Sequence, residues 1–137
     1  MSKPYIHAQS CARKWGGVPE DYLEIHQHLD SSKGAIADNR HRALTHNSWY
    51  IAPGGPLELI FGVNITNSDG KLVSVRDIGE RHILEDFRMR YIPSASDWLQ
   101  LIEPQPWMNN GLSGSPESHK KVEEKNLENT SRMVTID

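Results

Sequence analysis

Several residue types and patterns are scarce in this chain of 137 residues, and each scarcity excludes a class of protein. A single cysteine, Cys11, allows neither an internal disulfide nor a cysteine-based zinc finger. No run approaches the roughly 18 apolar residues that a membrane-spanning helix needs. The N-terminus, MSKPYIHAQS, lacks the apolar segment of a signal peptide. We therefore expect a cytoplasmic protein with no membrane contact.

The charge balance is close to neutral, with 15 basic residues, 18 acidic residues and a formal net charge of −3. Such a balance gives no overall attraction to nucleic acid or to an anionic membrane, so nucleic-acid binding is not expected. The composition does not indicate an oligomeric state.

The sequence divides into two parts of different composition. Residues 1–108 carry the aromatic residues and most of the branched apolar ones, and they predict one globular domain. Residues 109–137 contain no aromatic residue and few large apolar ones. Such a segment buries too little surface to offset its ordering entropy, so we predict a flexible, disordered polar tail.

Hydrophobic periodicity predicts a small α+β domain in which three to four helices pack on a two-stranded antiparallel hairpin. The predicted helices cover residues 19–32, 38–46, 78–87 and 95–102. The first strand is predicted from an alternating apolar series, Leu57, Leu59, Phe61, Val63 and Ile65. The NSDG turn at 67–70 and a second strand at 71–76 complete the hairpin.

Histidine is abundant in the predicted domain, which contains six of the seven: His7, His26, His28, His41, His46 and His82. Helical spacing places His26 beside Asp30 and His82 beside Asp86, because side chains four residues apart meet on a helix. Neutral imidazole is the commonest metal ligand and titrates near neutral pH. Histidines gathered with carboxylates therefore predict a metal site or an acid–base site.

We predict a divalent metal bound between the first three helices, with ligands chosen from His26, His41, His46, His82, Asp30 and Asp86. Nitrogen and carboxylate ligands favour zinc and also suit iron, manganese or nickel. The alternative is a set of core histidines, each hydrogen-bonded to a carboxylate. Neither HExxH nor an HD dipeptide occurs, so no metalloenzyme motif supports the choice.

If the protein is an enzyme, which the sequence leaves open, a metal-dependent hydrolase of a phosphate ester or nucleotide fits best. The metal would activate water, Glu80 would act as the base, and Arg40 or Arg76 would hold the anion. Arg40 and Glu80 can equally form a buried ion pair, since both fall on predicted apolar faces.

A non-enzymatic binding protein is the alternative function, engaging a host protein or sequestering a small anionic ligand. Trp49 and Tyr50 in a predicted loop would then be contact residues. Gly16 and Gly17, just before the first predicted helix, form either a plain turn or an anion cradle.

A series of motifs runs through the predicted domain: His7, GGVPEDY at 16–22, IH at 25–26, Asp30, RHRAL at 40–44, His46, FG at 61–62, NSDGK at 67–71, Glu80, His82 and ED at 85–86. Over nearly all of residues 7–108 the chain resembles a family of short bacterial and phage proteins of unknown function. The resemblance implies no activity. It does imply that a mostly polar set belongs to the family pattern: His7, His26, Asp30, Arg40, His41, Arg42, His46, Arg76, Glu80, His82 and Asp86. The chain departs from that pattern in the loop after His46, after Asp86 and in its tail.

Overall fold

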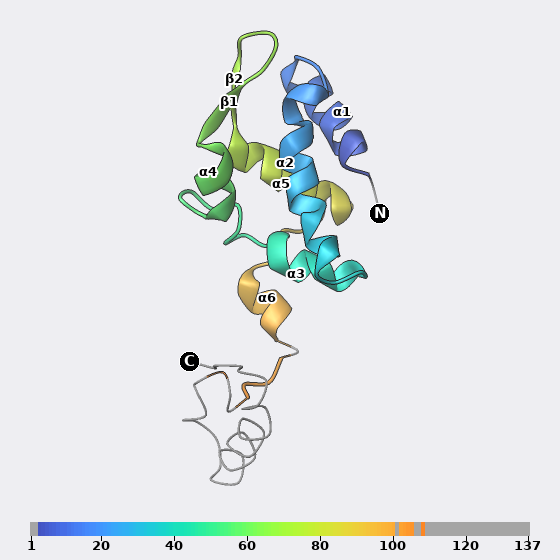
Figure 1. The fold of residues 1–137 in the computed structure, drawn as a ribbon, viewed down its shortest axis with the longest axis vertical. Helices are drawn as coiled ribbons and strands as arrows, with labels where there is room; N and C mark the ends of the chain where they lie inside the picture. Colours follow the sequence, from blue (N-terminus) through green and yellow to red (C-terminus); the bar gives the residue numbers. More distant parts are fainter. Residues whose placement is uncertain (1–2, 101, 106–107, 109–137) are drawn as a thin grey trace, which may run out of the picture. The chain divides into compact units, whose positions relative to one another are not determined.

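The fold is known from a computed structural model that describes residues 3–100, 102–105 and 108, so the predicted tail at 109–137 lies outside the described residues. The α+β class is confirmed (Figure 1). No described helix is both long enough and apolar enough to cross a bilayer. The elements follow in the order α1 (Pro4–Trp15), α2 (Glu20–Asp30), η1 (Ser31–Gly34), η2 (Asn39–His41), α3 (Arg42–Thr45), α4 (Pro56–Phe61), β1 (Asn64–Thr66), β2 (Leu72–Ser74), α5 (Val75–Asp86) and α6 (Ala95–Leu99), where η marks a 3₁₀ helix.

Helix α1 was not predicted from the sequence. Pro4 suits the first turn, where its missing N–H is not needed, and Arg13 and Lys14 complement the negative end of the helix dipole. Two of the four side chains on its buried face are polar, namely His7 and Ser10. Its apolar stripe, formed by Ala8, Cys11, Ala12 and Trp15 at helical spacing, consists mostly of small side chains, so it is easily overlooked in the sequence.

The predicted first strand is wrong over its first half, because residues 56–61 form helix α4. Pro56 begins this helix and Gly62, with φ of 87°, ends it. Leu57 is buried, whereas Leu59 is 79% exposed. A short apolar run cannot by itself distinguish a strand from a helix, and here the flanking proline and glycine decide.

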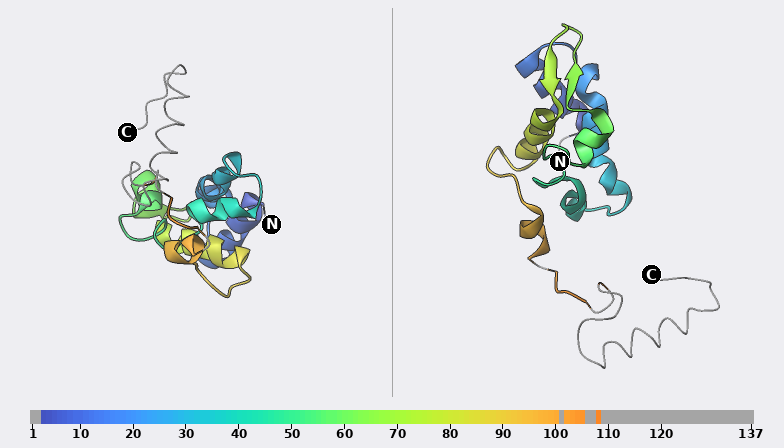
Figure 2. Two further views of the ribbon diagram at one scale, coloured as in Figure 1. Left: turned by 90° about the horizontal axis from the view of Figure 1, so that it is seen from below. Right: turned by 90° about the vertical axis from the view of Figure 1, so that its left-hand side faces the viewer.

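The predicted hairpin is confirmed in a shorter form (Figure 2). Strands β1 and β2 pair antiparallel, with Ile65 opposite Val73. Val73 is buried and Ile65 packs against the core, while Asn64, Thr66 and Leu72 on the other face are exposed and Ser74 is half-buried.

The apolar core lies where α1, α2, α4 and α5 meet (Figure 1). A glycine on α5 allows this close packing: a Cβ at Gly79 would lie 2.8 Å from side-chain atoms of both Ile51 and Leu57. The buried apolar residues are Ala8, Cys11, Tyr22, Ile25, Leu29, Ile51, Leu57, Val73, Val75, Ile78 and Ile83.

The glycine pair between α1 and α2 binds the tip of the hairpin. The Gly17 N–H donates to Asp69 Oδ2 at 2.8 Å, and the Ser68 N–H donates to Asp21 Oδ2 at 2.9 Å. Gly16 has φ of 89°, and a Cβ there would lie 2.7 Å from Asp69 Oδ2. The anion that this turn binds is therefore a carboxylate of the protein itself.

The second predicted helix, 38–46, is divided into η2 and the four-residue helix α3. Asp38 caps it, accepting from the Arg40 N–H at 2.9 Å. Its buried side chains include His41 and Thr45, while the apolar Leu44 is 47% exposed. Polar contacts, rather than apolar packing, hold this short segment.

Helix α6 begins with a capping box, in which the Ser94 N–H donates to Asp97 Oδ2 at 2.8 Å and the Asp97 N–H donates to Ser94 Oγ at 3.1 Å. The indole N–H of Trp98 donates to the His46 carbonyl oxygen at 3.0 Å. This bond ties α6 to the segment that carries His46.

Candidate metal centre

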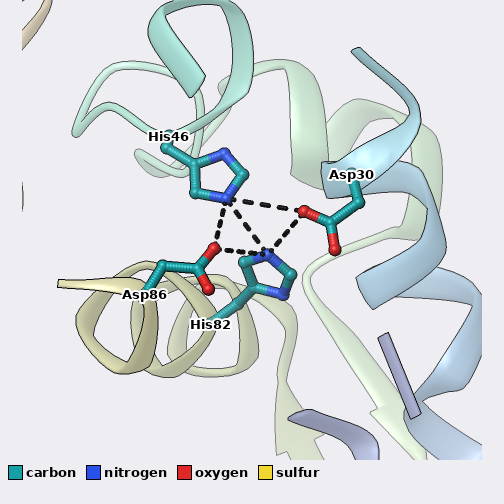
Figure 3. A group of neighbouring side chains, drawn as sticks. All are labelled: Asp30, His46, His82 and Asp86. Atoms are coloured by element: carbon teal, nitrogen blue, oxygen red, sulfur yellow. Dashed lines mark hydrogen bonds and ion pairs between the residues drawn. The ribbon is translucent and has the colours of Figure 1, made fainter. Parts of the chain in front are cut away.

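Four buried side chains from three segments meet in the interior (Figure 3). Asp30 is the last residue of α2 and His46 follows α3, while His82 and Asp86 lie four residues apart on α5. Each offers one nitrogen or oxygen, and these four atoms all lie within 4.8 Å of one another. We refer to Asp30, His46, His82 and Asp86 together as the cage.

The separations in the cage match those of ligands around one ion. His46 Nε2 lies 2.9 Å from Asp86 Oδ2 and 3.7 Å from Asp30 Oδ1. His82 Nε2 lies 3.1 Å from His46 Nε2, 3.2 Å from Asp30 Oδ1 and 3.4 Å from Asp86 Oδ2. Tetrahedral ligands at roughly 2.0–2.1 Å from zinc stand about 3.3 Å apart. The cage can therefore hold a metal ion.

Thr45 fixes which nitrogen of His46 carries the proton. The Thr45 hydroxyl donates to the Leu29 carbonyl oxygen at 2.7 Å, so its single proton is used there. His46 Nδ1 lies 2.9 Å from the same hydroxyl oxygen and must donate to it. In neutral His46, Nε2 is consequently a bare lone pair that points into the cage.

That lone pair faces a carboxylate, an arrangement that needs a cation. Burial lowers the pKa of His46, although the neighbouring Asp86 opposes this, so the imidazole is neutral near pH 7. Burial raises the pKa of Asp86, but contacts with His46, His7 and His82 outweigh it and hold the pKa well below its ordinary value. The contact with His46 favours the ionised carboxylate only if a proton or a metal ion lies between the two atoms, since two bare acceptors 2.9 Å apart repel each other.

The outer oxygen of Asp86 is held from the other side by His7 and Arg42. His7 Nε2 lies 3.2 Å and Arg42 Nη2 3.7 Å from Asp86 Oδ1, and His7 Nδ1 lies 2.9 Å from Glu85 Oε1. Burial lowers the pKa of His7, but contacts with Asp86 and Glu85 reverse this and raise it to about 9. A charged His7 between two carboxylates keeps the inner oxygen of Asp86 aimed at the cage.

Two predicted ligands, His26 and His41, lie outside the cage. His26 Nδ1 lies 2.9 Å from His82 Nδ1, on the side of that ring away from the cage atoms. Burial, together with the charges of His82 and His7, lowers the pKa of His26 to about 2. His41 is buried, and its Nδ1 lies 2.7 Å from Ser32 Oγ. The structure thus brings together four of the six predicted ligands.

The residues predicted to catalyse, Arg40, Arg76 and Glu80, are not part of the cage, and the two arginines are exposed while Glu80 is half-buried. Arg40 is 82% exposed and bonds to Asp38 at 2.8 Å, so the predicted buried pair with Glu80 does not form. Arg76 and Glu80 lie 3.9 Å apart on the outer side of α5. Of the two predicted contact aromatics, Trp49 is exposed and Tyr50 bonds to His28.

Sequence reasoning missed Thr45 and Glu85 as parts of this centre. Neither residue type is a distinctive signal, since Thr and Glu are common on solvated helix surfaces. Glu85 is adjacent to Asp86 in the family motif, and that pairing was the available clue.

The family model for Domain of unknown function (DUF6915) matches residues 2–108. No curated protein and no solved structure matches the chain. Since the match covers well over half of the sequence, this protein belongs to the DUF6915 family, and the resemblance of its motifs to an uncharacterised family is confirmed.

Proposed function

We propose that the domain binds one divalent metal ion through Asp30, His46, His82 and Asp86. The observation that carries this proposal is the bare Nε2 of His46, which lies 2.9 Å from an ionised, buried carboxylate. A metal ion between them turns repulsion into coordination. The partners of these ligands on their outer sides, Thr45 and His7, are of the kind that orient metal ligands.

Zinc is the metal that this ligand set favours. The four cage ligands are two imidazole nitrogens and two carboxylate oxygens. They include no sulfur, since Cys11 Sγ lies beside His26 instead. Four such ligands in a compact cage suit tetrahedral zinc. Iron, manganese and nickel accept the same donors, but iron and manganese bind more weakly by the usual affinity order.

We propose a structural role for this ion. Its ligands come from the ends of two helices and from the turn after α3, so coordination would join three segments that are distant in sequence. Four protein ligands fill a tetrahedral shell, whereas hydrolytic zinc sites keep one position open for water. Metal binding at such a site contributes directly to folding free energy.

The geometry gives little support to a function as a phosphate-ester or nucleotide hydrolase. Such a hydrolase requires a base and an anion-binding group beside the ion. The predicted candidates Glu80, Arg76 and Arg40 are instead engaged with one another or with Asp38 at the surface. We therefore assign them no role in the centre.

Elemental analysis of protein purified without a histidine tag tests the metal proposal. We expect about one equivalent of zinc per chain, or uptake of one equivalent after metal is added to chelator-treated protein. The variants Asp86→Asn and His82→Ala should not bind zinc, because each lacks one cage ligand. His28→Ala is the matched control, because His28 lies on α2 but bonds to Tyr50 at 2.7 Å. Folded wild-type protein that takes up no divalent metal would end the proposal.

A further inference from the structure

A file of three buried side chains lies behind the cage and links α1, α2 and α5. Cys11 Sγ lies 3.2 Å from His26 Nε2, and His26 Nδ1 lies 2.9 Å from His82 Nδ1. All three side chains are fully buried. The rings of His26 and His82 are nearly parallel, at 18°, with centroids 5.1 Å apart. None of the groups in this file except His82 belongs to the cage.

The contact between the two Nδ1 atoms holds one proton, since a hydrogen bond needs one donor and one acceptor. If His82 Nδ1 carries it, His82 Nε2 is a bare lone pair that faces the cage. If His26 Nδ1 carries it, His82 Nδ1 is the acceptor, and a hydrogen on His82 Nε2 would point at Asp30 Oδ1, 3.2 Å away. Only the first arrangement leaves His82 able to bind a metal.

We propose that His26 is a positioning residue that accepts the Nδ1 proton of His82 and so directs the His82 Nε2 lone pair to the metal. The inference rests on the proposed metal function and extends it to a residue outside the cage. It gives His82 the same kind of support that Thr45 gives His46. Partners of this kind fix the tautomer and ring orientation of metal-bound histidines.

Cys11 completes the file as an acceptor. With Nδ1 of His26 accepting, the single proton of neutral His26 lies on Nε2 and points at Cys11 Sγ. Burial, and then the charge of Glu85, raises the pKa of Cys11 to about 12, so the sulfur remains a thiol and is a weak acceptor. Both tautomers of the pair hold one proton on each imidazole. Converting one arrangement into the other moves the shared proton between the two Nδ1 atoms, removes the proton from Nε2 of one ring and adds a proton to Nε2 of the other, so no net proton is released.

Zinc affinity, measured by competition with a chromophoric chelator, tests the role of His26. His26→Leu removes the acceptor, and we expect zinc to bind about 10–100-fold more weakly. His26→Asn places an amide oxygen near the position of Nδ1 and should recover most of the affinity. His28→Leu, on the same helix, is the control and should bind like wild type.

Nitrogen-15 NMR of histidine-labelled wild-type protein gives a readout that a packing role would not change. In the zinc-loaded protein, His82 should carry its proton on Nδ1 and His26 on Nε2. This measurement also decides the matter if His26→Leu fails to fold.

These measurements distinguish failure of the proposed metal function from failure of the role proposed for His26. If wild-type protein takes up no zinc, the proposed function itself fails. If wild type binds zinc but His26→Leu binds it equally well, or loaded His82 has no proton on Nδ1, only the role of His26 is overturned.

Discussion

At the residue scale, the chemistry of the centre depends on which nitrogen of each imidazole carries a proton. His46 and His82 both offer Nε2 to the cage, and each has its Nδ1 against a buried partner. Asp86 likewise presents one oxygen inward and has the other against His7 and Arg42. The side chains around the cage therefore orient three of its four members before any ion binds.

Thr45→Val tests this orientation at His46. The substitution keeps the shape of the side chain but removes the oxygen that accepts from His46 Nδ1, so Nε2 becomes free to take the proton. We expect zinc to bind at least about 10-fold more weakly. The lost bond to the Leu29 carbonyl should also lower the free energy of unfolding by about 1 kcal/mol. Chelator competition and urea unfolding measure the two effects.

Thr66→Val is the matched control for Thr45→Val, since Thr66 is exposed on β1. It should leave zinc affinity unchanged. Equal affinities for both variants would show that Thr45 has no part in orienting His46.

Asp30, His82 and Asp86 were predictable as candidates, because histidine and aspartate four residues apart on a helix are visible in the sequence, and His46 was a candidate only as one of the histidines of the predicted domain. The sequence could not predict which four of the six candidate ligands would meet. His26 lies on α2 with Asp30, yet its ring contacts the back of His82 instead of the cage. That difference depends on how α2 and α5 pack, which helical periodicity within one segment does not specify.

At the scale of elements, close helix packing depends on Gly79. Gly79→Ala would place a methyl group 2.8 Å from side-chain atoms of Ile51 and Leu57, so either those buried side chains or α5 itself would have to shift. We expect a loss of about 1–3 kcal/mol in the free energy of unfolding. Gly34→Ala is the control, since nothing lies within 4 Å of a Cβ there. Similar stability of the two variants in urea unfolding would contradict this account of the packing.

The Asp21 carboxylate joins the start of α2 to the hairpin tip. It accepts from the Val18 N–H, the Ser68 N–H and the Ser68 hydroxyl at 2.9, 2.9 and 2.7 Å. These bonds lower the pKa of Asp21 below its ordinary value of 3.8. A depressed pKa in the folded state stabilises the protein above the unfolded value, and this contribution is lost as pH falls through the folded value.

Asp21→Asn should therefore destabilise the protein in a pH-dependent way. Because the carboxylate lies at the surface and is screened by solvent, we expect a loss of only about 0.2–1 kcal/mol at pH 7, which shrinks once the pH falls below 3.8 and the carboxylate becomes protonated. Urea unfolding of both proteins at pH 7 and in acid measures it. Glu24→Gln, at an exposed position of α2, serves as the control. A difference that stays constant with pH would exclude an electrostatic origin.

Elements with strong local signals could be predicted, and those that tertiary contacts define could not. Helix α2, the hairpin turn and the α6 capping box were recognisable from their own residues. Helix α1 was not, because its buried face carries His7 and Ser10, which contact Glu85 across the core. The apolar side chains on the same side, Ala8, Cys11 and Ala12, are small, so the stripe that they form with Trp15 at helical spacing is a weak signal.

At the scale of the molecule, the polar interior requires a compensating charge. Asp30 and Asp86 are ionised and buried, and His46 is neutral. Of the two Asp86 oxygens, the one that Arg42 and His7 face is the outer oxygen, which points away from the cage. Burying charge without a close partner is costly, so a divalent ion in the cage would stabilise the folded domain more than its contacts alone suggest.

Removing the metal should consequently lower the thermal stability of the whole domain. A ligand bound only by the folded state adds about 2.7 kcal/mol at 100 times its dissociation constant, which corresponds to roughly 10–20 °C in melting temperature for a domain of this size. We expect a chelator to lower the melting temperature by this amount and added zinc to restore it. Asp86→Asn should melt lower than the zinc-bound wild type and respond to neither treatment, because it lacks a cage ligand. A wild-type melting temperature that is the same with chelator and with excess zinc would mean that the carboxylates are neutralised by protons, and the structural role of the ion would be excluded.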